Sequence, residues 1–196
     1  MIAGAVVLAA VGWAFTFGLH WGNFWIKIGI TVAAVCAYSL RWQRPRVNWR
    51  AGSVALGLLS AALLYLVFFI GNLLAPYVVP GAHTQVGGVY GLGAGSPRIL
   101  ILLLLLLVTG PGEEIFWRGF LQQRLMQRWG EVAGYVVTTL LYACVHVFSR
   151  NPMLILAALV AGAFWGAQYL WKRDLLALIV SHALWSAVIF AVAPVQ

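Results

Sequence analysis

Long apolar segments, each about as long as a membrane-spanning helix, make up most of this sequence. Hydrophobic residues account for 63% of the 196 residues and charged residues for only 8%, whereas a soluble domain carries about 25% charged residues. Because so few charges cannot cover a surface that faces water, the composition excludes a soluble globular protein, a disordered tail and a disulfide scaffold. We therefore expect an all-α, polytopic membrane protein.

Taking about 20 apolar residues per span predicts about seven transmembrane helices in a single membrane domain over residues 1–196. The expected spans are 2–20, 23–40, 52–74, 98–122, 132–149, 153–171 and 175–194. The segment between Pro76 and Pro97 is rich in glycine and is expected to be a flexible external loop. Residues 1–97 thus hold three helices and this loop, and residues 98–196 hold the remaining helices.

Basic residues gather in loops on one side of the predicted bundle. Twelve Lys and Arg against four acids give a formal net charge of +8, which alone would suit nucleic-acid binding. Their positions argue against it, because most lie in three loops that alternate to the same side: Arg41, Arg44, Arg46, Arg50, Arg124, Arg128, Lys172 and Arg173. Such loops are typically cytoplasmic. We expect a protein of the plasma (inner) membrane with a cytoplasmic N-terminus, membrane lipid as a partner, and no nucleic acid.

Two adjacent glutamates lie inside an apolar segment, residues 111–120, with the sequence PGEEIFWRGF. A charge near the bilayer centre costs on the order of 2.5–3.5 kcal/mol, so each carboxylate needs a partner. Glu114 and Arg118 are four residues apart on one helical face and can form an ion pair. Glu113 is turned about 100° around the same helix. Its partner must therefore come from another helix.

Histidines on two later spans are the candidate partners of Glu113. His146 lies about as far after Gly130 as Glu113 lies before it, so an antiparallel helix pair that turns at Gly130 places them at equal depth. His182 follows the basic loop 172–174 by a shorter distance. We expect all three side chains to meet at one depth, in a site that opens toward the cytoplasmic side.

Hydroxyl groups lie one helical turn from each of these histidines. Tyr142 precedes His146 and Ser186 follows His182, each by four residues, so each pair shares a helix face. The hydroxyls can fix an imidazole tautomer or line an anionic site. Alternatively, the two histidines are ordinary interhelical hydrogen-bonding residues. His20, between the first two spans, is expected at the membrane interface.

Three motifs stand in order on successive predicted helices. They are Glu113-Glu114-x-x-x-Arg118, Tyr142-x-x-x-His146 and His182-x-x-x-Ser186. In this order and spacing they resemble the CAAX-protease and bacteriocin-processing family of intramembrane endopeptidases, also called the Abi family, over about residues 98–194. The first motif matches almost without change. The family usually has Phe where this chain has Tyr142, and Asn or Asp where it has Ser186.

The resemblance implies hydrolysis of a peptide bond in a membrane-associated or lipidated, CAAX-like peptide or protein, with residues 98–196 as the catalytic core. Glu113 is then the general base that activates a water molecule, and His146 helps to orient that water. His182 and Ser186 stabilise the tetrahedral oxyanion. Three further residues support the site: Glu114, Arg118 and Tyr142.

Glu113, His146 and His182 are also a plausible three-ligand zinc set. Because they come from three helices, without a short paired spacing such as His-x-x-x-His, the sequence does not favour zinc over a metal-free site. We expect no required cofactor, with zinc on these three residues as the alternative. Two other function classes stay open: a non-catalytic scaffold or bacteriocin-immunity protein of the same fold, and a small proton-coupled transporter, since intramembrane Glu and His also mark ion pathways.

Overall fold

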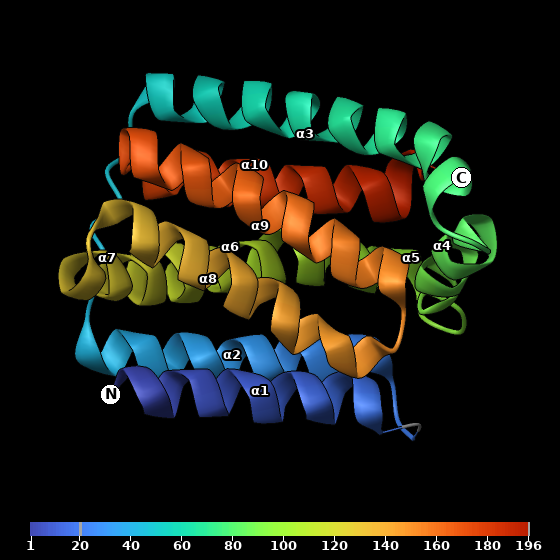
Figure 1. Cartoon of the computed structure of the whole chain (residues 1–196), viewed down its shortest axis with the longest axis horizontal. Helices are drawn as coiled ribbons and strands as arrows, with labels where there is room; N and C mark the ends of the chain where they lie inside the picture. Colours follow the sequence, from blue (N-terminus) through green and yellow to red (C-terminus); the bar gives the residue numbers. More distant parts are fainter. Residues whose placement is uncertain (20, 196) are drawn as a thin grey trace.

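The computed structural model describes residues 1–19 and 21–195, which form helices packed side by side in one bundle (Figure 1). Six of the helices in this part of the chain are long and apolar enough to cross a membrane, and the apolar first helix is shorter. The predicted all-α polytopic bundle is confirmed, and the chain is an integral membrane protein. His20, which we predicted at the membrane interface, lies outside the described residues.

The helices follow the predicted segments closely. Their bounds are α1 Ile2–Gly18, α2 Phe24–Trp42, α3 Ala51–Val78, α4 Ala82–Gly91, α5 to α7 Arg98–Trp129, α8 with η3 Glu131–Ser149, α9 Pro152–Lys172, and α10 with η4 Leu175–Val192. The two chain termini lie at opposite ends of the bundle (Figure 1). The basic loops meet at one end, where Arg124 donates to the carbonyl of Trp42 and Arg173 to Glu131. We name this the basic end and the opposite end the α4 end.

The helix that carries the adjacent glutamates is longer than predicted and is interrupted by π-helical turns. It consists of α5 Arg98–Leu104, η1 Leu105–Thr109, α6 Gly110–Phe116, η2 Trp117–Gln122 and α7 Gln123–Trp129. Such π turns inside α-helices are frequent at functional sites. Glycines bring neighbouring helices close to α6: a Cβ on Gly110 would lie 2.7 Å from Cα of Ala183, and one on Gly112 would lie 2.5 Å from Val32. The glutamates are thus held tightly between α2 and α10.

Short, well-defined turns set the heights of the later helices. Gly130 has a φ of +90°, which an L side chain rarely adopts, and it reverses the chain between α7 and α8. The side chain of Asn151 caps α9 by accepting from the amide of Leu154, and Pro152 follows at the first helical position. Asp174 caps α10 in the same way, through the amide of Ala177. These turns fix His146 and His182 relative to Glu113.

The segment predicted as a flexible glycine-rich loop contains the helix α4, so that prediction was wrong. Gln85 ties α4 to the start of α9: its carbonyl accepts from the Asn151 side chain at 2.8 Å, and its side-chain oxygen accepts from the amide of Met153 at 3.1 Å. Apolar Val86 and Val89 give α4 a face that packs against the bundle. Tertiary contacts therefore outweigh the low helix propensity of its glycines.

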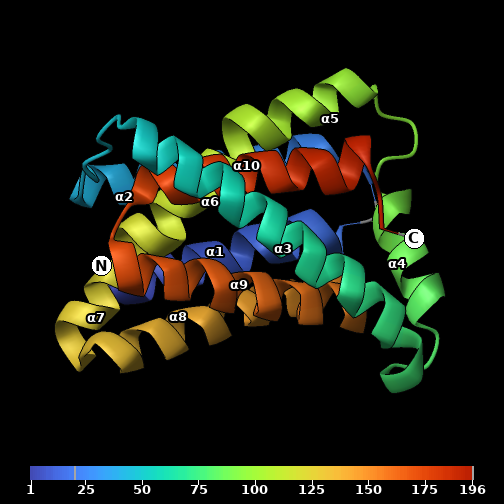
Figure 2. The same cartoon turned by 90° about the horizontal axis from the view of Figure 1, so that it is seen from above.

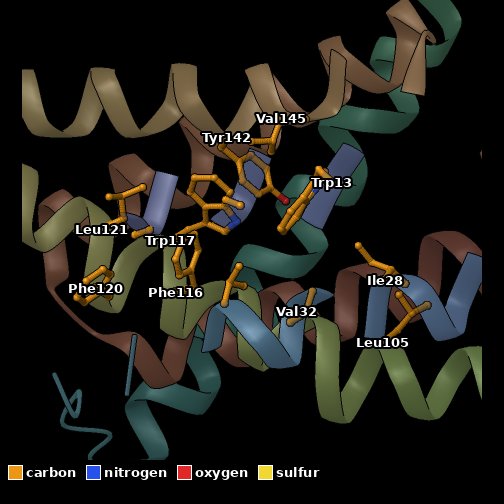
Figure 3. Packing of buried hydrophobic residues seen from close by; sticks show 14 of the residues in the cluster. Trp13, Ile28, Val32, Leu105, Phe116, Trp117, Phe120, Leu121, Tyr142 and Val145 are labelled. Carbon is orange, nitrogen blue, oxygen red and sulfur yellow. The ribbon is translucent and has the colours of Figure 1, made fainter. Parts of the chain in front are cut away.

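Two buried clusters form the core. The larger joins α1, α2, α6, η2 and α8, and includes Trp13, Phe116, Trp117 and Tyr142 (Figure 3). The smaller joins α3, α9 and α10 around Trp165. In Figure 2, α3 starts beside α10 and then runs away from it toward α4. A cavity lies between α3, α4, α9 and α10.

Candidate active site

Glu114 lies at the centre of a buried charge cluster. Its Oε1 accepts from Nη1 of Arg118 at 2.8 Å and lies 2.7 Å from Nδ1 of His182. The side chain of Glu114 is completely buried, and Arg118 and His182 are nearly so. Because a carboxylate only accepts, Nδ1 of His182 carries a proton. The predicted Glu114–Arg118 ion pair is present, but His182 binds Glu114 and not, as we expected, Glu113.

Arg118 also connects this cluster to α9. Its Nη2 donates to the carbonyl of Gly162 at 3.2 Å, and one turn further along Gln122 donates to the carbonyl of Gly166 at 2.9 Å. The guanidinium lies 4.9 Å from the ring centre of Tyr142. Because the two glycines of α9 have no side chains, their carbonyls are open to these donors. The charge cluster therefore also locks α9 onto η2.

Glu113 has a different partner. The hydroxyl of Tyr142 donates to Oε2 of Glu113 at 2.9 Å, and no hydrogen bond from another described residue reaches Oε1. The expectation that the partner comes from another helix was correct, since Tyr142 belongs to α8. Neither of the expected partners, His146 and His182, hydrogen-bonds to Glu113, because each imidazole is held by a different group.

Both ring nitrogens of His146 are hydrogen-bonded. Nδ1 lies 2.8 Å from the carbonyl of Tyr142, which only accepts, so Nδ1 carries the proton. The indole nitrogen of Trp13 donates to Nε2 at 3.3 Å. An indole N–H only donates, so Nε2 is an unprotonated acceptor in this arrangement. His146 is therefore a neutral imidazole held between α8 and α1.

One cavity of about 130 Å³ brings the predicted catalytic residues together. Its walls include Glu113, Tyr142, His146, His182 and Ser186. Further lining residues are Phe24 and Trp25 at the start of α2 and Leu92 just after α4, so the cavity extends toward the α4 end. The prediction that the site opens on the side of the basic loops was therefore wrong, because those loops lie at the opposite end.

The three motifs lie in a region that matches a known protein family. A family model described as "Type II CAAX prenyl endopeptidase Rce1-like" matches residues 95–188. Residues 95–188, which we call the Rce1-like half, are similar to this family. The match contains all three motifs and confirms the resemblance inferred from them. No curated protein and no solved structure compared with the chain matches it. The Rce1-like half thus relates this membrane protein to CAAX-type peptidases.

The three possible zinc ligands of the Rce1-like half do not form a metal site as they stand. No group of three His, Cys, Asp or Glu side chains among residues 1–19 and 21–195 is placed to hold a metal ion. Nε2 of His146 accepts from Trp13 in this arrangement, whereas His182 uses only Nδ1, on Glu114. The three side chains are therefore not gathered around a common metal position in this conformation.

Sequence reasoning missed two tryptophans beside the Rce1-like motifs. Trp165 stacks on the ring of His182, with centroids 3.9 Å apart and planes at 18°, and donates to Oγ of Ser181 at 3.1 Å. Trp13 donates to His146. Both are completely buried. Their mid-span positions were the available signal, because tryptophans that anchor a helix at the membrane surface lie at span ends.

Proposed function

We propose that this protein is an intramembrane endopeptidase in which Glu113 activates water to hydrolyse a peptide bond of a membrane-associated or lipidated substrate. One observation carries the proposal: Glu113, His182 and Ser186, which all belong to the residues that match a peptidase family, line the same cavity. No nucleophilic Ser or Cys is required.

Glu113 acts as the general base. Its carboxylate takes a proton from water while the water oxygen attacks the carbonyl carbon of the substrate. Tyr142 holds the carboxylate through Oε2, which leaves Oε1 for the water. When the C–N bond breaks, the same proton passes from Glu113 to the departing amine. Glu113 thus acts first as the base and then as the acid, and it ends the reaction as a carboxylate again.

His182 and Ser186 face the oxyanion. Glu114 fixes the orientation of His182 through Nδ1, which leaves Nε2 as the group available to the cavity. The carboxylates of Glu113 and Glu114 and the guanidinium of Arg118 together carry a net charge of −1. A positively charged, doubly protonated His182 neutralises this buried site. Nε2–H of His182 and the hydroxyl of Ser186 can then both donate to the oxyanion, where each preorganised donor contributes about 3–4 kcal/mol.

A larger apolar cavity supports an apolar or lipidated substrate. It measures about 340 Å³, lies where α3 diverges from α9 and α10, and shares Leu154, Ala157, Trp185 and Phe190 with the catalytic cavity. An apolar chain bound there lies next to a peptide bond at Glu113.

Gly71 lines this apolar cavity, and a Cβ added to it would meet no other atom within 4 Å. A larger side chain at this position can therefore fill the cavity without disturbing the helices around it. Gly71→Phe should raise KM for a lipidated peptide severalfold and leave that for an unlipidated peptide unchanged. Equal effects on both peptides contradict the assignment of this cavity to the lipid.

The main test is cleavage of a quenched fluorescent peptide library by the purified protein. We expect wild type to cleave, and both Glu113→Gln and His182→Ala to lose at least about 100-fold in rate. Glu131→Gln is the matched control, because Glu131 is an exposed glutamate paired with Arg173 at the basic end. A chelator should leave the wild-type rate unchanged. No cleavage by wild type, or equal cleavage by all variants, rejects the proposal.

We also propose the plasma (inner) membrane as the location, with the N-terminus and the basic end in the cytoplasm, because basic loops favour that side. The catalytic cavity then faces the opposite side of the membrane. In a Cys36→Ser, Cys144→Ser background, an impermeant maleimide applied to intact cells should label His83→Cys, beside the α4 end, and spare Arg128→Cys. Both positions are exposed. The reverse pattern of labelling inverts the proposed orientation.

A further inference from the structure

Among the described residues, Trp13 is the one that links the first helix to the imidazole of His146 by a hydrogen bond. It belongs to α1, outside residues 95–188 that match the family model. Its side chain is completely buried and lines the catalytic cavity together with His146. A residue from the half of the chain without catalytic motifs thus reaches the centre of the candidate site.

His146 needs support from outside its own helix. It is the first residue of η3, the short 3-10 turn that follows α8, and the chain leaves that turn through Arg150 in a left-handed conformation. At such a helix end fewer backbone hydrogen bonds constrain the chain. The carbonyl of Tyr142 holds Nδ1 of the ring, and Trp13 is the group that holds Nε2.

Trp13 is itself placed by close packing of α1 on α2. A Cβ on Gly12 would lie only 2.6 Å from Cγ2 of Thr31, so a larger residue at position 12 would push the helices apart. The carbonyl of Gly12 accepts from the hydroxyls of both Thr16 and Thr31, at 2.9 and 3.0 Å. Trp117 packs edge-on against the Trp13 ring, with centroids 5.8 Å apart (Figure 3). The indole nitrogen therefore has a fixed height and direction.

We propose that Trp13 is a positioning residue for His146: its indole N–H fixes the imidazole plane and keeps Nε2 an acceptor that faces the cavity. The 3.3 Å bond is just longer than the usual 2.7–3.2 Å range. It is weak enough for the O–H of an incoming water to replace it at Nε2. The water that Glu113 deprotonates is then met by an imidazole nitrogen that is already turned toward it. This role rests on the proposed peptidase function.

Trp25 provides a matched control. It is also buried, lines the same cavity and donates its indole N–H, but to the carbonyl of Leu92 at 3.0 Å and not to a histidine. Trp13→Phe and Trp25→Phe each remove one indole hydrogen bond and keep an aromatic ring. A loss that comes only from packing or stability appears in both variants, whereas a loss of His146 positioning appears in Trp13→Phe alone.

The test combines nitrogen NMR of ¹⁵N-histidine-labelled protein in lipid nanodiscs with cleavage kinetics, the His146 signals being identified by their absence in His146→Gln. We expect Trp13→Phe to move the Nε2 signal of His146 toward that of an unbonded nitrogen and to lower kcat about tenfold, with KM within about twofold. Trp25→Phe should leave the His146 signals in place.

Unchanged His146 signals in Trp13→Phe, or equal shifts in both variants, overturn the proposal, as does an unchanged kcat in active protein. The NMR readout needs no turnover. If wild type cleaves nothing, the proposed peptidase function fails by itself, while the position of the Nε2 signal still decides whether Trp13 holds His146.

Discussion

Two faces of α6 carry neighbouring glutamates that differ in their burial and in their hydrogen-bond partners. On one face Glu114 is completely buried and shares a single oxygen between Arg118 and His182. On the other face Glu113 lines a cavity and receives one hydrogen bond, from Tyr142. The charge of Glu114 is therefore used to hold helices together and to orient His182, whereas the charge of Glu113 is open to chemistry. Identical residue types one position apart are divided by the helix into a structural and a reactive side chain.

The reactive face should show the largest effect on rate. Glu113→Gln removes the base but keeps the side-chain shape and the hydrogen bond from Tyr142, so the rate should fall at least about 100-fold with little change in melting temperature. Cleavage kinetics and thermal unfolding of the same sample check both statements. If the rate survives, Glu113 is not the base.

The structural face should show the largest effect on stability. Arg118→Met leaves the charge of Glu114 buried without its guanidinium, which should lower the free energy of unfolding by about 3–5 kcal/mol. Arg173→Met breaks the exposed pair with Glu131 and should cost at most about 1 kcal/mol. Unfolding in mixed micelles measures both. Equal losses would show that burial does not distinguish the two ion pairs.

Tyr142→Phe tests the hydrogen bond that orients the carboxylate of Glu113. Removing the hydroxyl deletes the hydrogen bond to Oε2 of Glu113, so the carboxylate becomes less well oriented and kcat should fall about tenfold. The ring continues to pack on Trp117 and Arg118. A fall in stability without a fall in kcat would assign Tyr142 to the structural face.

The smallest effect is expected at Ser186. Ser186→Asn places a longer side chain with two N–H donors at the cavity wall, so oxyanion stabilisation should be kept or improved. We expect a rate between the wild-type value and about tenfold above it. A loss of more than tenfold would mean that the cavity is too small for the carboxamide and that Ser186 matters by its size.

The sequence predicted the helical bundle well, because apolar length and short basic loops depend on local composition. It also paired Glu114 with Arg118, since both lie on one helix four residues apart. It did not predict that His182 bonds to Glu114, because the partner of His182 is decided by how α10 packs on α6, where Gly110 allows close approach. The contact between Trp13 and His146 joins residues 133 positions apart, and no local spacing indicates it.

The most direct test of these different roles on α6 is to measure the activity and stability of Glu113→Gln and Glu114→Gln side by side. Each change removes one carboxylate charge, and the two positions are adjacent. For each variant, the activity per folded molecule and the free energy of unfolding are both measured. We predict that Glu113→Gln stays as stable as wild type but loses at least about 100-fold in activity, whereas Glu114→Gln loses several kcal/mol of stability and keeps more activity per folded molecule. Indistinguishable behaviour of the two variants, or the opposite pattern, would contradict the account.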